Sequence, residues 1–255
     1  MRQIAIDEIS VAKGHRYLTV VLDLERGNVL FVGDGKGADA LLPFWRRLRA
    51  SGAKIRAVAT DMSLAYIEAV SNHLSGALHV FDHFHIIKLY NEKLTDLRRD
   101  VYRELTERMH KEVLKGIRWL LLKNPENLDP KKNEKGRLDE ALKLNTPLFT
   151  AYYMKEKLRQ LWDQDNKGEA RRHLNEWIAL AEASGIRMLI NFAKTMRTYR
   201  EGILNYYNYP ISTGPLEGTN NKIKTMKRQA YGFRDHAFFK LKILAIHETR
   251  WELVG

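Results

Sequence analysis

Residues 4–9, Ile4-Ala5-Ile6-Asp7-Glu8-Ile9, decide the fold class. The segment alternates like a strand yet is partly apolar on both faces, which is typical of a strand in the centre of a sheet. Four more short apolar runs follow, at residues 17–24, 29–32, 55–59 and 77–81. The sequence therefore predicts five strands in the first third of the chain.

The connections between these runs predict how the strands pair. Short turns separate the first three runs, which predicts an antiparallel meander. Helix-spaced segments at 38–50 and 63–74 precede the last two runs, so these strands should lie parallel to their neighbours. This order predicts an α/β fold with a mixed five-stranded sheet of ribonuclease-H-like topology.

The pattern of hydrophobic residues changes after residue 85. Strand signals give way to helical periodicity, which predicts helices at 86–123, 136–144, 147–162, 167–183 and 186–206. Two more helices are expected at 216–230 and 235–251. We therefore expect a first part of the core at 1–85, an all-helical insertion at 86–205 and a return to the core at 206–255.

The composition limits the classes of partner that the protein can bind. The 255 residues include 43 Lys and Arg against 31 Asp and Glu, a net charge of +12, which favours DNA or RNA over an anionic membrane, although a merely soluble basic protein remains an alternative. There is no cysteine, which excludes disulfides and Cys-based zinc sites. No apolar run approaches the roughly 20 residues of a membrane span, so we expect a cytoplasmic protein with access to the chromosome.

Three carboxylates are candidates for chemistry. Asp7 lies mid-strand, where a charge is costly unless cations or donors satisfy it; its alternative is a strand-end residue facing water. Asp61 ends the fourth predicted strand, beside which ligands bind in such sheets, or it caps the next helix. Glu217 fits the first turn of a late helix. Hard oxygen ligands favour Mg²⁺ or Mn²⁺ over zinc.

The helix after Pro215 combines acid, amide and cations. Helical spacing puts Glu217, Asn221, Lys224 and Arg228 on one face, with Lys222 and Lys227 nearby. This face suits a metal site beside a phosphate backbone, or it is an ordinary solvated surface. The opposite face should pack on the sheet through Leu216, Ile223, Met226 and Ala230.

Positive charge gathers near the third carboxylate. Residues 218–250 contain eight Lys or Arg residues against two acids, which argues for DNA lying across the site. Tyr231 and Phe233 interleave with these charges and could stack on a flipped base, but such aromatic residues belong more often to a core, which is the interpretation we favour.

Four motifs in order resemble one family. They are DE at 7–8 with KGHRY at 13–17 and VVLD at 20–23, TDMS at 60–63, FDHFHIIK at 81–88, and GPLEGTNNKIK at 214–224 continuing to AYGF at 230–233. Together they are similar to the DDE domain of insertion-sequence transposases of the ISL-three family, over nearly the whole chain.

The resemblance implies roles for matching positions. Asp7, Asp61 and Glu217 correspond to the three metal-binding carboxylates, which implies two Mg²⁺ or Mn²⁺ ions, and a helical insertion precedes the last of them. Asp82 and His85 match an Asp-x-x-His signature whose role is open: it orders the site, contacts DNA or is structural. A homodimer on double-stranded DNA is expected from the resemblance.

Family members carry a zinc-binding segment and a helix-turn-helix ahead of this domain, whereas Met1 stands six residues before Asp7 here. Whether this chain recognises the sequence of the element ends is therefore an open question. Two alternatives stay open: another ribonuclease-H-like nuclease such as a junction resolvase, which would make no strand-transfer products, and a non-catalytic DNA-binding remnant.

Overall fold

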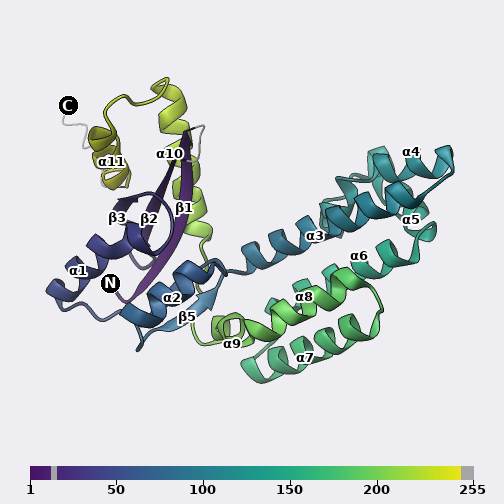
Figure 1. Cartoon of the computed structure of the whole chain (residues 1–255), viewed down its shortest axis with the longest axis horizontal. Coiled ribbons are helices and arrows are strands. Elements are labelled where there is room, and N and C mark those ends of the chain that lie inside the picture. Colours follow the sequence, from purple (N-terminus) through teal and green to yellow (C-terminus); the bar gives the residue numbers. More distant parts are fainter. Residues whose placement is uncertain (13–15, 248–255) are drawn as a thin grey trace. The chain divides into compact units, whose positions relative to one another are not determined.

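A computed structural model describes residues 1–12 and 16–247 of the chain. It divides into two compact units, one made of residues 1–85 with 201–255 and the other of residues 86–200 (Figure 1). The sequence analysis places these divisions after residues 85 and 205. Residues 13–15, within the KGHRY motif, and 248–251, at the end of the last predicted helix, lie outside the described residues.

The first unit contains the predicted sheet. Its strand order is β3-β2-β1-β4-β5, with β1 and β2 antiparallel, β2 and β3 antiparallel, and β1, β4 and β5 parallel, which confirms the predicted topology. The strands are β1 (Gln3–Ala12), β2 (Arg16–Asp23), β3 (Val29–Asp34), β4 (Ala57–Thr60) and β5 (Leu78–Phe81).

Helices cover both faces of the sheet, because β1 is apolar on both. Ile4 and Ile6 belong to one core with a short 3-10 turn (Ala38–Leu41), α1 (Leu42–Ser51) and α2 (Leu64–His73). Ala5 and Ile9 belong to the other core, with α10 (Gly214–Gln229) and α11 (His236–Leu244). The last helix thus ends earlier than the predicted residue 251. Figure 1 shows α10 alongside β1.

The chain returns to the sheet beside its edge strand. After α9 (Arg200–Leu204) and a 3-10 turn (Asn205–Tyr207), the amide Nδ2 of Asn205 donates to the carbonyl of His79 at 2.9 Å. Gly202 packs so closely on the ring of Phe81 that a Cβ would lie 2.3 Å from it. Glycine permits this contact, which covers part of β5.

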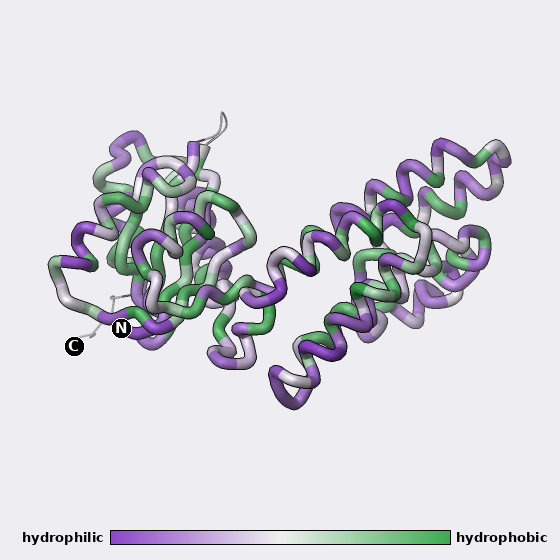
Figure 2. Tube along the Cα trace, turned by 60° about the horizontal axis from the view of Figure 1, so that its bottom comes forward, coloured by the Kyte–Doolittle hydropathy of each residue, from purple (hydrophilic) through white to green (hydrophobic). Residues whose placement is uncertain are grey.

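The second unit is helical. It comprises most of α3 (His83–Glu104), then α4 (Arg108–Gly116), α5 (Glu134–Lys143), α6 (Thr146–Arg159), α7 (Lys167–Ala183) and α8 (Arg187–Thr198), with 3-10 turns at Leu120–Leu122, Pro125–Asn127, Pro130–Lys132 and Gln160–Asp163. The predicted helix 86–123 is therefore interrupted after Glu104. Hydrophilic and hydrophobic residues alternate along these helices, as expected for amphipathic helices (Figure 2).

Aromatic side chains form the centre of this unit. The rings of Tyr90, Trp177 and Phe192 meet edge to face, with centroids 4.9 to 6.2 Å apart. The hydroxyl of Tyr90 donates to the carbonyl of Ala151 at 2.7 Å. Within the described residues of the whole chain, no helix combines the length and apolarity that crossing a bilayer requires.

Candidate active site

Three aspartates lie in one row across the parallel strands: Asp7 is in the middle of β1, and Asp61 and Asp82 directly follow β4 and β5. Ala5 of β1 pairs with Ala59 of β4, and Thr60 of β4 pairs with Phe81 of β5. Extending these registers puts Asp7, Asp61 and Asp82 at the same level. Strand spacing then separates neighbouring backbones by about 4.8 Å.

Strand alternation also puts the three aspartates on the same face. Ala5, Ala59 and Val80, two residues before each aspartate, all belong to the core that α10 and α11 cover. Successive side chains of a strand point to opposite faces, so residues two apart share one. This alternation directs Asp7 towards the α10 side of the sheet, and the same pattern extended by one residue beyond β4 and β5 favours that side for Asp61 and Asp82.

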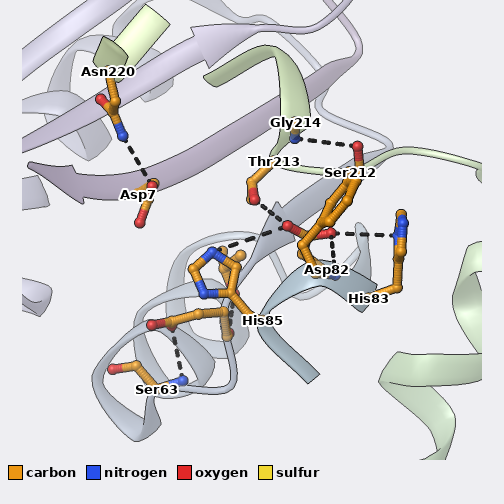
Figure 3. A network of polar contacts seen from close by, with 12 residues as sticks. Asp7, Ser63, Asp82, His83, His85, Ser212, Thr213, Gly214 and Asn220 are labelled. Atoms are coloured by element: carbon orange, nitrogen blue, oxygen red, sulfur yellow. Dashed lines mark hydrogen bonds and ion pairs between the residues drawn. The ribbon is translucent and has the colours of Figure 1, made fainter. Parts of the chain in front are cut away.

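Asp7 contacts α10 directly. The amide Nδ2 of Asn220 donates to its carboxylate at 2.9 Å (Figure 3). Burial raises the pKa of Asp7 above its ordinary value, and the negative charge of Asp61 adds to this effect. The charge of His85 acts in the opposite direction. Asp7 thus lies within electrostatic reach of both Asp61 and His85, and a nearby cation would favour its ionised form.

Its neighbour Glu8 points to the opposite face. The Oε1 atom of Glu8 accepts hydrogen bonds from the hydroxyl of Tyr66 at 2.9 Å and from the backbone N–H of Gly37 at 3.0 Å. These bonds tie β1 to α2 and to the loop before α1. Glu8 therefore has a structural role, and the two acids of the DE motif are separated by the pleat of the strand.

Asp61 makes the turn between β4 and α2. Its Oδ1 atom accepts a hydrogen bond from the backbone N–H of Ser63 at 2.9 Å, and Ser63 is the residue at which α2 is capped. Ser63 is the N-cap of α2, so Asp61 itself does not cap the helix as the sequence alternative suggested. Its bond to Ser63 shapes the turn before α2 and leaves the second carboxylate oxygen for other partners.

Asp82, the third aspartate of the row, makes structural contacts. Its side chain is buried, and it accepts hydrogen bonds from the hydroxyl of Thr213 and, at 3.2 Å, from the backbone N–H of Phe84. His83 Nδ1 and His85 Nε2 lie 3.5 and 4.0 Å from its oxygens (Figure 3). Asp82 therefore joins the start of α3 to the segment that leads into α10.

Glu217 occupies the first turn of α10 and is exposed. Asn220, three residues later and 5% exposed, is the α10 residue that contacts Asp7. Residues three apart are neighbours on a helix surface, about 5–6 Å between their Cβ atoms. Glu217 thus lies one turn from the contact with Asp7.

Convergence of the three predicted carboxylates stays a prediction. Within residues 1–12 and 16–247, no three Asp, Glu, His or Cys side chains form a group arranged to hold a metal ion. The sequence analysis also missed Asn220, because its contact with Asp7 depends on the packing of α10 against β1. The spacing of three residues from Glu217 indicates only that the two residues are neighbours on the helix surface.

The donor atoms beside Asp7 nevertheless suit a divalent cation. The Oδ1 atom of Asn220 is buried and has no hydrogen-bond partner in the described part of the chain. Such an orphaned acceptor is costly until a cation or a water molecule satisfies it. Two neighbouring aspartates and this amide are all oxygen donors, the chemistry that Mg²⁺ and Mn²⁺ prefer.

The predicted DNA-binding residues of α10 differ in their surroundings. Asn221, Lys222, Lys224 and Arg228 are exposed. Lys227 is half-buried, and its ammonium donates to the carbonyl of Val11 at the end of β1. On the opposite face Leu216 and Ile223 are buried and Met226 packs beside them, as predicted, but Ala230 is exposed because it caps the end of the helix.

The two aromatic residues after α10 differ. Phe233 packs on the core and stacks on Phe239, with ring centroids 4.6 Å apart, so the core assignment is confirmed. Tyr231 is fully exposed, so the core assignment is wrong for this residue. Its positive φ of 51° turns the chain out of the helix and leaves the ring outside the core.

The chain is similar to known proteins over nearly its whole length. The family model of ISL3-type DDE proteins, described as transposase, matches residues 4–243. The transposase of insertion sequence IS1001 from Bordetella parapertussis is 40% identical over 245 residues, 95% of this chain and 60% of that protein. The transposase of IS1557 from Mycobacterium tuberculosis is 30% identical over 279 aligned positions, 100% of this chain and 62% of that protein.

The fold has a counterpart among solved structures. The Drosophila P element transposase strand transfer complex aligns with a TM-score of 0.50 and 11% identity, covering 97% of this chain and 77% of that one. At this identity the likeness concerns the fold. The chain spans about three fifths of the length of the two insertion-sequence relatives. Because the family model covers nearly the whole chain, this protein belongs to the ISL3-type family of DDE transposases.

Proposed function

We propose that this chain is the catalytic domain of an insertion-sequence transposase, which cleaves DNA strands and transfers them with two divalent ions, Mg²⁺ or Mn²⁺. The observation that carries the proposal is the register that aligns Asp7, in the middle of β1, with Asp61, which directly follows β4. Like charges so close repel each other, and cations between them relieve the repulsion.

The side chains of the site have separate tasks. Asp7 and Asp61 would hold the ions, and Glu217 would complete the shell by turning in from the first turn of α10. Asn220 orients the carboxylate of Asp7 through its hydrogen bond. When bound, two such ions activate the attacking water or 3′-hydroxyl and stabilise the leaving oxygen.

The substrate would be double-stranded DNA, both as element ends and as target. The net charge of +12 supports a polyanionic partner, and Lys222, Lys224 and Arg228 lie exposed on the helix that carries Glu217. Such cations bind phosphates and set affinity, whereas sequence choice needs base contacts. Two copies acting on paired ends would form a homodimer on the DNA.

A plasmid assay tests the proposal. Supercoiled plasmid is incubated with the chain and Mn²⁺, and nicked and joined products are separated on a gel. The variant Asp61→Asn should abolish nicking, whereas Asp39→Asn, at an exposed carboxylate in the short 3-10 turn before α1, should leave it unchanged.

The products distinguish the alternatives. Nicking with joined products supports transposase chemistry, whereas nicking without any joined product supports a nuclease such as a resolvase. DNA binding without nicking would favour the non-catalytic remnant. Unchanged nicking by Asp61→Asn would remove this residue from the mechanism.

A further inference from the structure

A basic pocket lies at the carboxyl end of α10. Its volume is about 560 Å³, and its walls include Ser10, Asn221, Lys224, Lys227, Arg228 and Tyr231. Ligand pockets for small molecules and single nucleotides have volumes in this range. All of these residues belong to the first unit, so the pocket is built within one compact body.

The charge of the pocket is entirely positive among its described walls. Lys224 and Arg228 are exposed, and Lys227 is held in place by its bond to the carbonyl of Val11. Three cations without a carboxylate favour an anionic ligand, and phosphate groups satisfy such sites. A neutral or cationic ligand is disfavoured.

Tyr231 adds an aromatic surface. Two hydrogen bonds define the turn that carries it: its backbone N–H donates to the carbonyl of Arg228 at 3.1 Å, and that of Gly232 donates to the carbonyl of Lys227 at 2.9 Å. The turn keeps Tyr231 at a φ of 51°, which costs free energy for a residue with a side chain. The ring is therefore presented fully to solvent by a defined backbone.

Cations and an exposed ring together select one kind of ligand. A nucleotide carries a phosphate and an aromatic base, and both faces of a paired base are covered by its neighbours in the duplex. We propose that this pocket binds an unpaired nucleotide of the DNA, whose base stacks on Tyr231 and whose phosphate pairs with Lys224 and Arg228. The proposal rests on the proposed function, because it takes the DNA substrate from it.

The pocket also has a defined place relative to the candidate active site. Arg228 lies eight residues after Asn220 on α10, which corresponds to about 12 Å along the helix axis at 1.5 Å per residue. Nucleotides along a duplex strand are spaced about 3.4 Å apart. For a DNA strand that follows the axis of α10, the unpaired nucleotide would lie roughly four nucleotides from the phosphate that is cleaved.

A binding assay without metal tests the pocket independently of catalysis. The full chain is titrated, in the presence of EDTA, into a fluorescein-labelled duplex with one thymine opposite an abasic site, and into the same duplex fully paired; anisotropy reports the Kd. We expect tighter binding of the duplex with the unpaired thymine by about tenfold, the typical effect of stacking one base on an aromatic ring.

Four variants test which side chains cause the preference for the unpaired thymine. Tyr231→Ala should abolish it with little change for the paired duplex, and Tyr231→Phe should retain it. Lys224→Ala should weaken both duplexes alike. Tyr153→Ala, at an exposed tyrosine of the helical unit, is the matched control and should bind as the unchanged chain does.

Two results would overturn the proposal: equal affinity of the unchanged chain for both duplexes, or a preference that survives Tyr231→Ala. These outcomes are separate from the plasmid assay. If the unchanged chain shows no preference but nicks DNA with Mn²⁺, the pocket proposal alone is refuted. If the unchanged chain shows the preference but does not nick DNA, the catalytic proposal alone is refuted.

Discussion

Replacing Asn220 by alanine removes the observed link between α10 and Asp7. In the folded chain the Asn220 amide donates to the Asp7 carboxylate at 2.9 Å; Asn220 is buried and Asp7 is half-buried. Without the donor, the ionised carboxylate loses a stabilising partner and its orientation towards Asp61. We therefore expect Asn220→Ala to weaken the binding of divalent ions.

The size of the effect follows from the type of bond. A hydrogen bond to a charged group contributes about 1.5–3 kcal/mol. At about 1.4 kcal/mol per factor of ten, this corresponds to roughly 10- to 100-fold. Removal of groups that orient metal ligands typically has an effect of about the same size. Half-maximal nicking should thus require about 10- to 100-fold more Mn²⁺.

The assay is plasmid nicking at a series of Mn²⁺ concentrations, with circular dichroism to confirm that the variant is folded. Asn221→Ala is the matched control, because Asn221 is the next residue on α10 but exposed. It should keep the Mn²⁺ requirement and affect at most DNA affinity. A folded Asn220→Ala variant with an unchanged Mn²⁺ midpoint would refute the role assigned to this amide.

Three further predictions concern stability. Asp7→Asn should abolish nicking yet raise Tm by a few degrees, because burial raises the pKa of Asp7 and its charge therefore opposes folding; a lowered Tm would contradict this. Burial lowers the pKa of His79 to about 4, whereas in the unfolded chain this side chain takes up its proton near pH 6.5. The free energy of unfolding should therefore fall by about 3 kcal/mol as the pH is lowered from 6.5 to 4. Urea unfolding of His79→Gln should lack this dependence. Lys155 is buried and donates to the carbonyls of Leu121 and Lys123 at 2.7 and 3.1 Å. Lys155→Ala should therefore destabilise the helical unit by about 3–5 kcal/mol in urea unfolding. A loss below about 1 kcal/mol would show that water replaces the ammonium.

Local sequence patterns determined the sheet and its topology. Alternation and turn signals depend on neighbouring residues, so five strands, their directions and the central place of β1 could be predicted before any coordinates. The same holds for the buried face of α10 around Leu216 and Ile223, which helical spacing predicts. The sequence motifs likewise predicted the family, and the comparisons confirm that prediction.

Contacts between distant segments depended on the tertiary structure. Asn220 is buried because α10 packs on β1, 213 residues away in sequence, and Thr213 is paired with Asp82 across 131 residues. No periodicity within either segment encodes such pairs. Tyr231 is an opposite case: its aromatic side chain favoured a place in the core, but a turn with positive φ directs it into solvent. The sequence by itself thus determined which elements form and which acids are candidates, whereas packing decided which side chains meet, because burial and hydrogen bonding are set by elements far apart along the chain.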